Sequence, residues 1–124
     1  VVGITSAVAL ANGYNHACAV LADRTAQCWG SNTYGQLGNG TNDDASAPVA
    51  VSGVSEAVAV TAGYNHTAVN LLNGTALAWG HNAYGQMGDG TVDSSNLPRA
   101  VSGLFNLDGL SAGNNHTIAL MSVR

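Results

Sequence analysis

The segment that decides the fold reads WGSNTYGQLGNGT at residues 29–41 and returns as WGHNAYGQMGDGT at residues 79–91. The offset is fifty residues, and the match continues on both sides without a gap. Upstream, residues 13–16 read GYNH, and the same offset gives GYNH at 63–66 and GNNH at 113–116. So many matches at one offset indicate an internal repeat.

Downstream of the segment, Pro48 and the sequence VSG at residues 51–53 return as Pro98 and VSG at residues 101–103. The chain therefore holds about two and a half copies of one unit. We divide it, as one repeat domain over 1–124, into units 1–50, 51–100 and 101–124, the last of which is incomplete.

Each unit has the pattern of several short strands. Segments rich in small and β-branched residues lie between Gly, Asn and Asp residues, which typically bound strands. Pro48 and Pro98 are expected to start a fourth strand, where the missing N–H is dispensable. Residues 107–110, LDGL, contain Gly and Asp, which argues against a helix there. The expected strands cover residues 6–10, 17–21, 25–29, 48–51, 57–61, 67–71, 75–79 and 98–101.

Four strands per fifty residues predict an all-β fold of β-propeller blades, each a four-stranded antiparallel sheet. WD repeats need a Trp-Asp pair, but both tryptophans here are followed by glycine. Kelch repeats need a Gly-Gly pair, and the chain contains none. The chain is therefore predicted to form a partial propeller of another repeat class.

The recurring residues are interpreted as structural. Three equivalent histidines could ring a metal, but ligands must come within about 2 Å of one ion, and neighbouring blades hold equivalent points further apart. The glycine-rich loop could cradle phosphate only with a lysine and a following helix. Tryptophan is expected between blades, where it buries on the order of 200 Å². The structural residues are Gly13, His16, Trp29, Gly30, Tyr34, Gly35, Gln36, Gly63, His66, Trp79, Gly80, Tyr84, Gly85, Gln86, Gly113 and His116.

Composition excludes several classes of function. Only 8% of residues are charged, with three Lys plus Arg against seven Asp plus Glu and a net charge of −4. This charge balance lacks the basic surface that nucleic acid binding requires. No apolar run approaches the ~18 residues of a membrane span, so no membrane insertion is expected.

Neither an enzyme nor a cofactor is predicted. Apart from the residues of the repeat motif, the sequence offers no Cys-His or Ser-His-Asp set for nucleophilic catalysis. The only adjacent carboxylates are Asp43 and Asp44. Asn39 and Asp43, with Asp89 and Asp93 in unit two, could offer oxygen ligands to calcium. Asn and Asp are also ordinary turn residues, and the full calcium-loop series of ligands is absent.

Two cysteines, Cys18 and Cys28, lie ten residues apart on consecutive expected strands. An even separation places both on one sheet face, where opposed Cβ atoms come within bonding range. Their counterparts in unit two are Ala68 and Ala78, so both cysteines are replaced together. We predict a disulfide in preference to two buried thiols. A disulfide predicts an extracellular, cell-surface or periplasmic location.

The motifs together resemble the regulator of chromosome condensation repeat family. The resemblance covers essentially the whole chain and rests on Ala-Gly-x-x-His, Trp-Gly-x-Asn-x-Tyr-Gly-Gln, and the later Pro and Val-x-Gly. It implies a propeller that usually has seven blades, in a family that includes exchange factors, inhibitors, photoreceptors and adaptors. The photoreceptor motif has Trp directly after the first Gly, where this chain has Tyr14, Tyr64 and Asn114.

The third unit has its Gly-x-x-His strand but no Trp-Gly strand after it. Strand edges left bare in this way are expected to find a partner. Two functions are therefore predicted. The first is a non-enzymatic extracellular structural protein whose copies complete one another's blades in a ring or filament. The alternative is a protein-binding module, of inhibitor or exchange-factor type, excerpted from a full propeller. The predicted assembly edge consists of Thr117, Ile118, Ala119, Leu120 and Met121.

Overall fold

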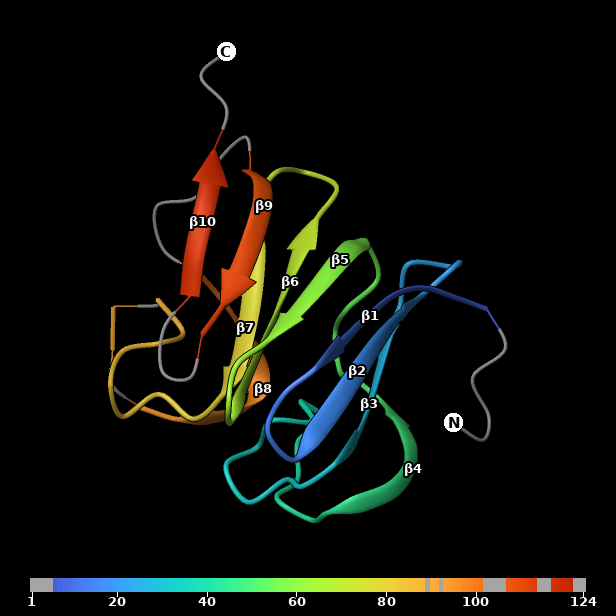
Figure 1. Ribbon diagram of the computed structural model, residues 1–124, viewed down its shortest axis with the longest axis vertical. Helices are drawn as coiled ribbons and strands as arrows, with labels where there is room; N and C mark the ends of the chain where they lie inside the picture. The colour runs from blue at the N-terminus through green and yellow to red at the C-terminus, as the bar shows by residue number, and fades with distance from the viewer. Residues whose placement is uncertain (1–5, 89, 92, 102–106, 114–116, 122–124) are drawn as a thin grey trace.

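The computed structural model describes residues 6–88, 90–91, 93–101, 107–113 and 117–121 of the chain. Within these residues, ten strands form three antiparallel sheets (Figure 1). The fold is all-β, with sheets that correspond to the blades of a partial propeller, as the sequence predicts. None of the described residues belongs to a helix long and apolar enough to cross a membrane.

The three sheets follow the order of the chain. Blade 1 consists of β1 (Ala7–Asn12), β2 (His16–Leu21), β3 (Ala26–Gly30) and β4 (Ala45–Ala50), hydrogen-bonded in that order. Blade 2 consists of β5 (Ala57–Ala62), β6 (His66–Leu71), β7 (Ala76–Gly80) and β8 (Ser95–Ala100) in the same order. Unit three contributes β9 (Leu107–Ala112), paired with β10 (Thr117–Met121). The LDGL sequence therefore lies in a strand.

The outer strand of each blade differs from the expectation. β4 begins at Ala45 and β8 at Ser95, so Pro48 and Pro98 lie inside these strands and do not start them. β4 pairs with β3 on one side only, and the register of that pairing is irregular around the proline. Proline is tolerated there because an edge strand has positions where no N–H is needed for the ladder.

The blades stack with their first strands innermost. β1 contacts β5 and β5 contacts β9, whereas β4 and β8 are the outer strands. Figure 1 shows β1 and β5 next to each other where the two blades meet. The core at this junction combines small and aliphatic side chains with the disulfide and one indole: Cys18, Val20, Ala26, Cys28, Leu37, Val51, Val54, Ala57, Val69 and Trp79.

The structure contains the Cys18–Cys28 disulfide. The two residues are direct partners in the β2–β3 register, with Cα atoms 4.1 Å and sulfur atoms 2.08 Å apart. Both are fully buried. Ala68 and Ala78 are direct partners at the same place in blade 2, so the same sheet geometry accepts either a disulfide or two methyl groups.

Trp79 joins blade 2 to blade 1. Its indole is fully buried, and Nε1 donates a hydrogen bond to the Gln36 carbonyl at 2.8 Å. The ring lies directly over Gly38, where an added Cβ would come within 2.7 Å of Nε1. Gly38 is therefore required both for its positive φ of 70° and for the space that it leaves. Trp29, at the same position in blade 1, is only partly buried.

Replacing Trp79 with alanine is expected to lower the free energy of unfolding by about 3–5 kcal/mol, as for other large-to-small core substitutions. Trp29→Ala is the matched control, and it should cost roughly half as much because part of the Trp29 indole is already exposed. Urea titration of both variants measures the difference. A loss below about 1 kcal/mol for Trp79→Ala would contradict the structural role of the indole.

Candidate functional site

The turns and long loops of both blades gather at one end of the sheets. In blade 1, His16 pairs with Gly30, so the β1–β2 turn lies beside the start of the loop at residues 31–44. The Ser31 N–H donates to the Asn15 carbonyl at 2.7 Å and fastens the loop to the turn. Blade 2 repeats this arrangement, and the two blades therefore present one continuous loop surface.

All four tyrosines of the chain lie on this loop surface. Their exposed fractions are 65% for Tyr14, 41% for Tyr34, 42% for Tyr64 and 72% for Tyr84. By contrast, the turns at residues 22–25, 51–56 and 72–75, at the other end of the two blades, contain no aromatic residue. Exposure of this size leaves a large part of each tyrosine side chain accessible in the described part of the chain.

The rings form two groups that cross the boundary between blades. Tyr14 stacks on Tyr64 with ring centroids 4.7 Å apart. The Tyr34 ring meets the His81 ring at 4.5 Å, and His81 meets Tyr84 at 5.9 Å. We call these five residues the tyrosine face. Each group combines residues of both blades, so the face exists only when the blades are packed together.

Glutamine side chains fix the backbone under two of these tyrosines. Gln36 Oε1 accepts the Tyr34 N–H at 2.9 Å, and Gln86 Oε1 accepts the Tyr84 N–H at 2.9 Å. Gln36 and Gln86 are themselves buried. Each tyrosine is therefore displayed from a loop whose backbone is held by a buried amide.

Asparagine side chains hold the same loops closed, a role that the sequence analysis did not assign. Asn32 is fully buried; its Oδ1 accepts the Leu37 N–H at 3.0 Å, and its Nδ2 donates to the Thr41 and Asp43 carbonyls. Asn82 makes the equivalent bonds in blade 2. The signal was present, because this asparagine is part of the repeated Trp-Gly-x-Asn motif.

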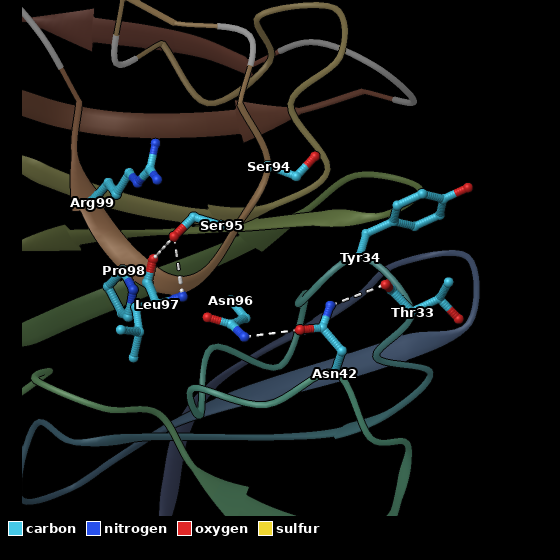
Figure 2. Close-up of a pocket in the computed structure, with 9 residues that line it drawn as sticks. All are labelled: Thr33, Tyr34, Asn42, Ser94, Ser95, Asn96, Leu97, Pro98 and Arg99. Atoms are coloured by element: carbon cyan, nitrogen blue, oxygen red, sulfur yellow. Dashed lines mark hydrogen bonds between the residues drawn. The ribbon is translucent and has the colours of Figure 1, made fainter.

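Two hollows border the tyrosine face. The first, of about 320 Å³, lies between the turns of the three units and is lined by Asn12, Gly13, Tyr14, Ala62, Gly63, Tyr64, Ala112 and Gly113. The second, of about 610 Å³, is a groove between the blade 1 loop and residues 94–99 in and before β8 (Figure 2). In this side groove Asn96 donates to Asn42, and Asn42 donates to the Thr33 carbonyl.

Charge is unevenly placed around the face. Asp43, Asp44 and Asp93 are exposed on the two loops. Asp44 also accepts the Asn32 N–H at 2.7 Å. The chain contains no lysine, and Arg99 is a positively charged residue exposed in the side groove. Within the described residues, no group of three or more His, Cys, Asp or Glu side chains could hold a metal ion.

The first histidine of the repeat lies buried at the junction of the blades. His16 Nε2 is 2.9 Å from Thr67 Oγ1, and that hydroxyl donates to the Gln36 carbonyl at 2.9 Å. A threonine hydroxyl has one proton, so Nε2–H is the donor to it and Nδ1 is unprotonated. Nδ1 is buried and has no hydrogen-bond partner among the described residues. His16 thus acts in blade packing.

The glycine of the Gly-x-x-His motif makes room for this histidine. A Cβ at Gly13 would overlap the His16 ring, and a Cβ at Gly63 would overlap the His66 ring. The motif is therefore one packing unit, in which the ring covers a backbone without a side chain.

The threonine that is hydrogen-bonded to this histidine was not predicted from the sequence. His66 Nε2 lies 3.1 Å from Thr117 Oγ1, and Thr117 donates to the Gln86 carbonyl at 2.8 Å, which repeats the first junction. Unit one has Ala17 where unit two has Thr67, so a comparison of these two units hides the pattern.

The other sequence predictions on unit three are only partly within the structure. Of the predicted assembly edge, Thr117 contacts blade 2 as described above, and the strand it begins pairs with β9. The side chains of Ile118, Ala119, Leu120 and Met121 lie outside the described part of the structure. His116 and Asp89 also lie outside the described residues.

Comparison with known proteins identifies the repeat. The family model described as "Regulator of chromosome condensation (RCC1) repeat" matches residues 28–69 and 73–120. A second model with the same description matches residues 6–36 and 57–86. A search of curated proteins finds no match.

Several solved structures are similar in fold. Human WBSCR16 is 21% identical over 96% of this chain and 32% of its own, with a TM-score of 0.85. Yeast RCC1 (Prp20), in a structure with Kap60, is 20% identical over 96% and 31%, with a TM-score of 0.80. Prp20p from Saccharomyces cerevisiae in another structure is 21% identical over 96% and 32%, with a TM-score of 0.81. The chain spans about a third of the length of these proteins.

Acidification is expected to weaken the junction of the blades through His16. Burial, with a smaller contribution from the nearby His66, lowers the pKa of His16 from 6.5 to about 4. Between these values the unfolded chain binds a proton that the folded chain does not, so the free energy of unfolding falls as the pH falls. The full shift corresponds to on the order of 3 kcal/mol.

Urea titrations at about pH 7 and about pH 4.5 test this expectation in the wild type and in His16→Gln, which cannot titrate. The wild type should lose more stability than the variant over this interval. An equal loss in both proteins would show that the buried imidazole does not carry the pH dependence.

Proposed function

Because the chain belongs to the regulator of chromosome condensation (RCC1) repeat family, we propose that it is a non-catalytic protein-binding module whose contact surface is the tyrosine face. The observation that carries the proposal is the exposure of all four tyrosines on one loop surface. One of the similar structures, yeast RCC1, is bound to the protein Kap60, and the structure of Prp20p is described together with its binding properties to Gsp1p and histones.

The composition of the face supports protein binding. Tyrosine gives a large contact area at low entropic cost because its side chain has two rotatable angles, and Ser, Gly and Asn supply adaptable hydrogen bonds. The two loops that carry the face are rich in these residues. Buried Asn32, Gln36 and their counterparts hold the loops in place. The loss of conformational entropy when a partner binds these loops is therefore small.

Tyr14→Ser combined with Tyr84→Ser is expected to abolish partner binding and leave the fold intact, since both rings are largely exposed. Leu72→Ser is the matched control, because Leu72 is 56% exposed in the turn at the other end of blade 2. The wild type and both variants would be immobilised, and the polypeptides that each retains would be compared. The affinity of each protein for a retained polypeptide would then be measured by calorimetry. We expect at least about a tenfold loss for the tyrosine variant alone, as for hot-spot residues.

Two results would contradict this proposal. In one, the tyrosine variant retains the same polypeptides with the same affinity as the wild type. In the other, Leu72→Ser loses them equally, which would place the contact surface elsewhere or indicate non-specific adhesion.

A second candidate function is self-association at the outer face of blade 1. Val8 and Leu10 on β1 are 65% and 67% exposed, and Trp29 is only partly buried. The equivalents of the first two in blade 2, Val58 and Val60, are partly buried at the junction with blade 1. Because blade 1 covers these positions in blade 2, a second copy of the chain could cover the exposed apolar positions of blade 1 in the same way. The disulfide supports an extracellular, cell-surface or periplasmic setting for such a structural assembly.

Sedimentation at increasing concentration tests the second candidate. The wild type should sediment well above the 12.4 kDa of one chain, and Leu10→Asp should shift it back to that mass. Leu97→Asp is the control, because Leu97 is 47% exposed on β8, away from this face. A wild type that stays at one chain mass would refute self-association and leave the tyrosine face untouched.

A further inference from the structure

We infer that the segment bound at the tyrosine face is basic, a stretch of a partner protein that presents lysine or arginine side chains. This inference rests on the proposed function, because it names the chemistry of the partner at that same surface. It follows from two features: the exposed carboxylates on the loop surface and the open surfaces of the tyrosine rings.

Carboxylates recur at the same position of both blades. Asp43 and Asp93 are fifty residues apart, and both are exposed on the loops that carry the face. Asp44 adds a third exposed carboxylate to the blade 1 loop. The chain has no lysine, and Arg24 lies in the turn at the other end of blade 1. Among the residues that the structure describes, the only arginine near this surface is therefore Arg99 in the side groove. Positive charge on a partner would complement the three acids.

The rings offer the second part of a site for cations. The electron-rich face of a tyrosine attracts an ammonium or guanidinium group within about 6 Å of the ring centroid. Tyr84 and Tyr14 are the most exposed of the four tyrosines, so their rings keep open surface after the contacts with His81 and Tyr64. At low ionic strength, a cation over one of these rings would also be attracted by the exposed acids on the same loop surface.

A buried glutamine holds the His81 ring between the two tyrosines. Gln86 Oε1 accepts the Tyr84 N–H, and the amide nitrogen of the same side chain lies 2.8 Å from His81 Nδ1. The row of rings from Tyr34 through His81 to Tyr84 is therefore anchored to the blade 2 loop.

The same surface is poorly suited to an acidic or purely aliphatic segment. Acidic side chains would meet Asp43, Asp44 and Asp93, and like charges brought together cost affinity. Three of the four large exposed aliphatic side chains of the described residues lie elsewhere, Val8 and Leu10 on β1 and Leu72 in the opposite turn. The fourth, Leu97, lines the side groove with Tyr34.

Two defined peptides serve as probes in the test. One is a short Gly-Ser peptide with several arginines, and the other has glutamate at the same positions. Binding to the full chain would be followed by NMR at low ionic strength, with the ring resonances of the tyrosines as the local readout. We expect the arginine peptide to shift these resonances, the glutamate peptide to leave them unchanged, and added salt to weaken binding.

A pair of charge-matched variants separates a local site from a general effect of net charge. Asp43→Asn with Asp93→Asn removes two charges from the face. Asp23→Asn with Glu56→Gln removes two at the other end, where Asn73 already makes in blade 2 the turn that Asp23 makes in blade 1. The face variant should weaken binding of the arginine peptide by at least about fivefold, and the control by less than about twofold. Tyr84→Phe should retain binding, and Tyr84→Leu should reduce it.

The inference is overturned if the glutamate peptide binds as well as the arginine peptide, or if the two charge variants weaken binding equally. The proposed function fails separately. If Tyr14→Ser with Tyr84→Ser releases the natural partner but the Asp43 and Asp93 variant does not, the face binds protein and the basic assignment is wrong. If the partner is retained by both variants, the face itself is not the contact surface.

Discussion

The carbonyl of Gln36 is the point on which both the packing of the blades and the exposed face depend. It accepts hydrogen bonds from Thr67 Oγ1 and Trp79 Nε1, both of blade 2, although Gln36 itself belongs to blade 1. The side chain of the same residue accepts the Tyr34 N–H. A buried acceptor is costly to leave unpaired, so any separation of the blades exposes or orphans these groups. One residue therefore couples the junction inside the protein to the display of a tyrosine outside it.

The repeated motif divides into a buried frame and an exposed surface. Asn32, Gln36 and Trp79 are buried, and Gly38 leaves the space that the indole fills. The tyrosines of the same motif point out of this frame with 41–72% of their surface exposed. Because buried hydrogen bonds hold this frame, it can keep adaptable contact residues in fixed relative positions, and such preorganisation favours binding. The rings also pair across blades, so loss of the junction would scatter the face as well as weaken the fold.

Most of the fold could be predicted from the sequence because its signal lies in one fifty-residue period. The blades, the disulfide register of Cys18 and Cys28, and the position of Trp79 between blades all follow from comparing units. The start of the outer strand at Ala45 could not be predicted, because edge pairing around Pro48 depends on the neighbouring strand. The tyrosines recur visibly in the sequence, but only the structure shows that their rings are exposed and gathered at one end. A repeated residue is recognised from the sequence alone, but whether its side chain is buried or exposed is not.

The places where the units differ distinguish the two candidate surfaces. At the junction between the two blades, His16 of blade 1 is hydrogen-bonded to the Thr67 hydroxyl of blade 2. The counterpart of Thr67 in blade 1 is Ala17, whose methyl side chain could not form such a bond with a histidine of another copy. A partner on the outer face of blade 1 would therefore have to rely on apolar contact with Val8 and Leu10, an interaction with little directional preference. The tyrosine face combines rings that meet across the blades, and buried amide side chains hold the backbone of the loops that carry Tyr34 and Tyr84. Specific recognition needs such directional groups, and for that reason the loop surface is the better candidate for a selective partner, while the outer face of blade 1 is suited to another blade.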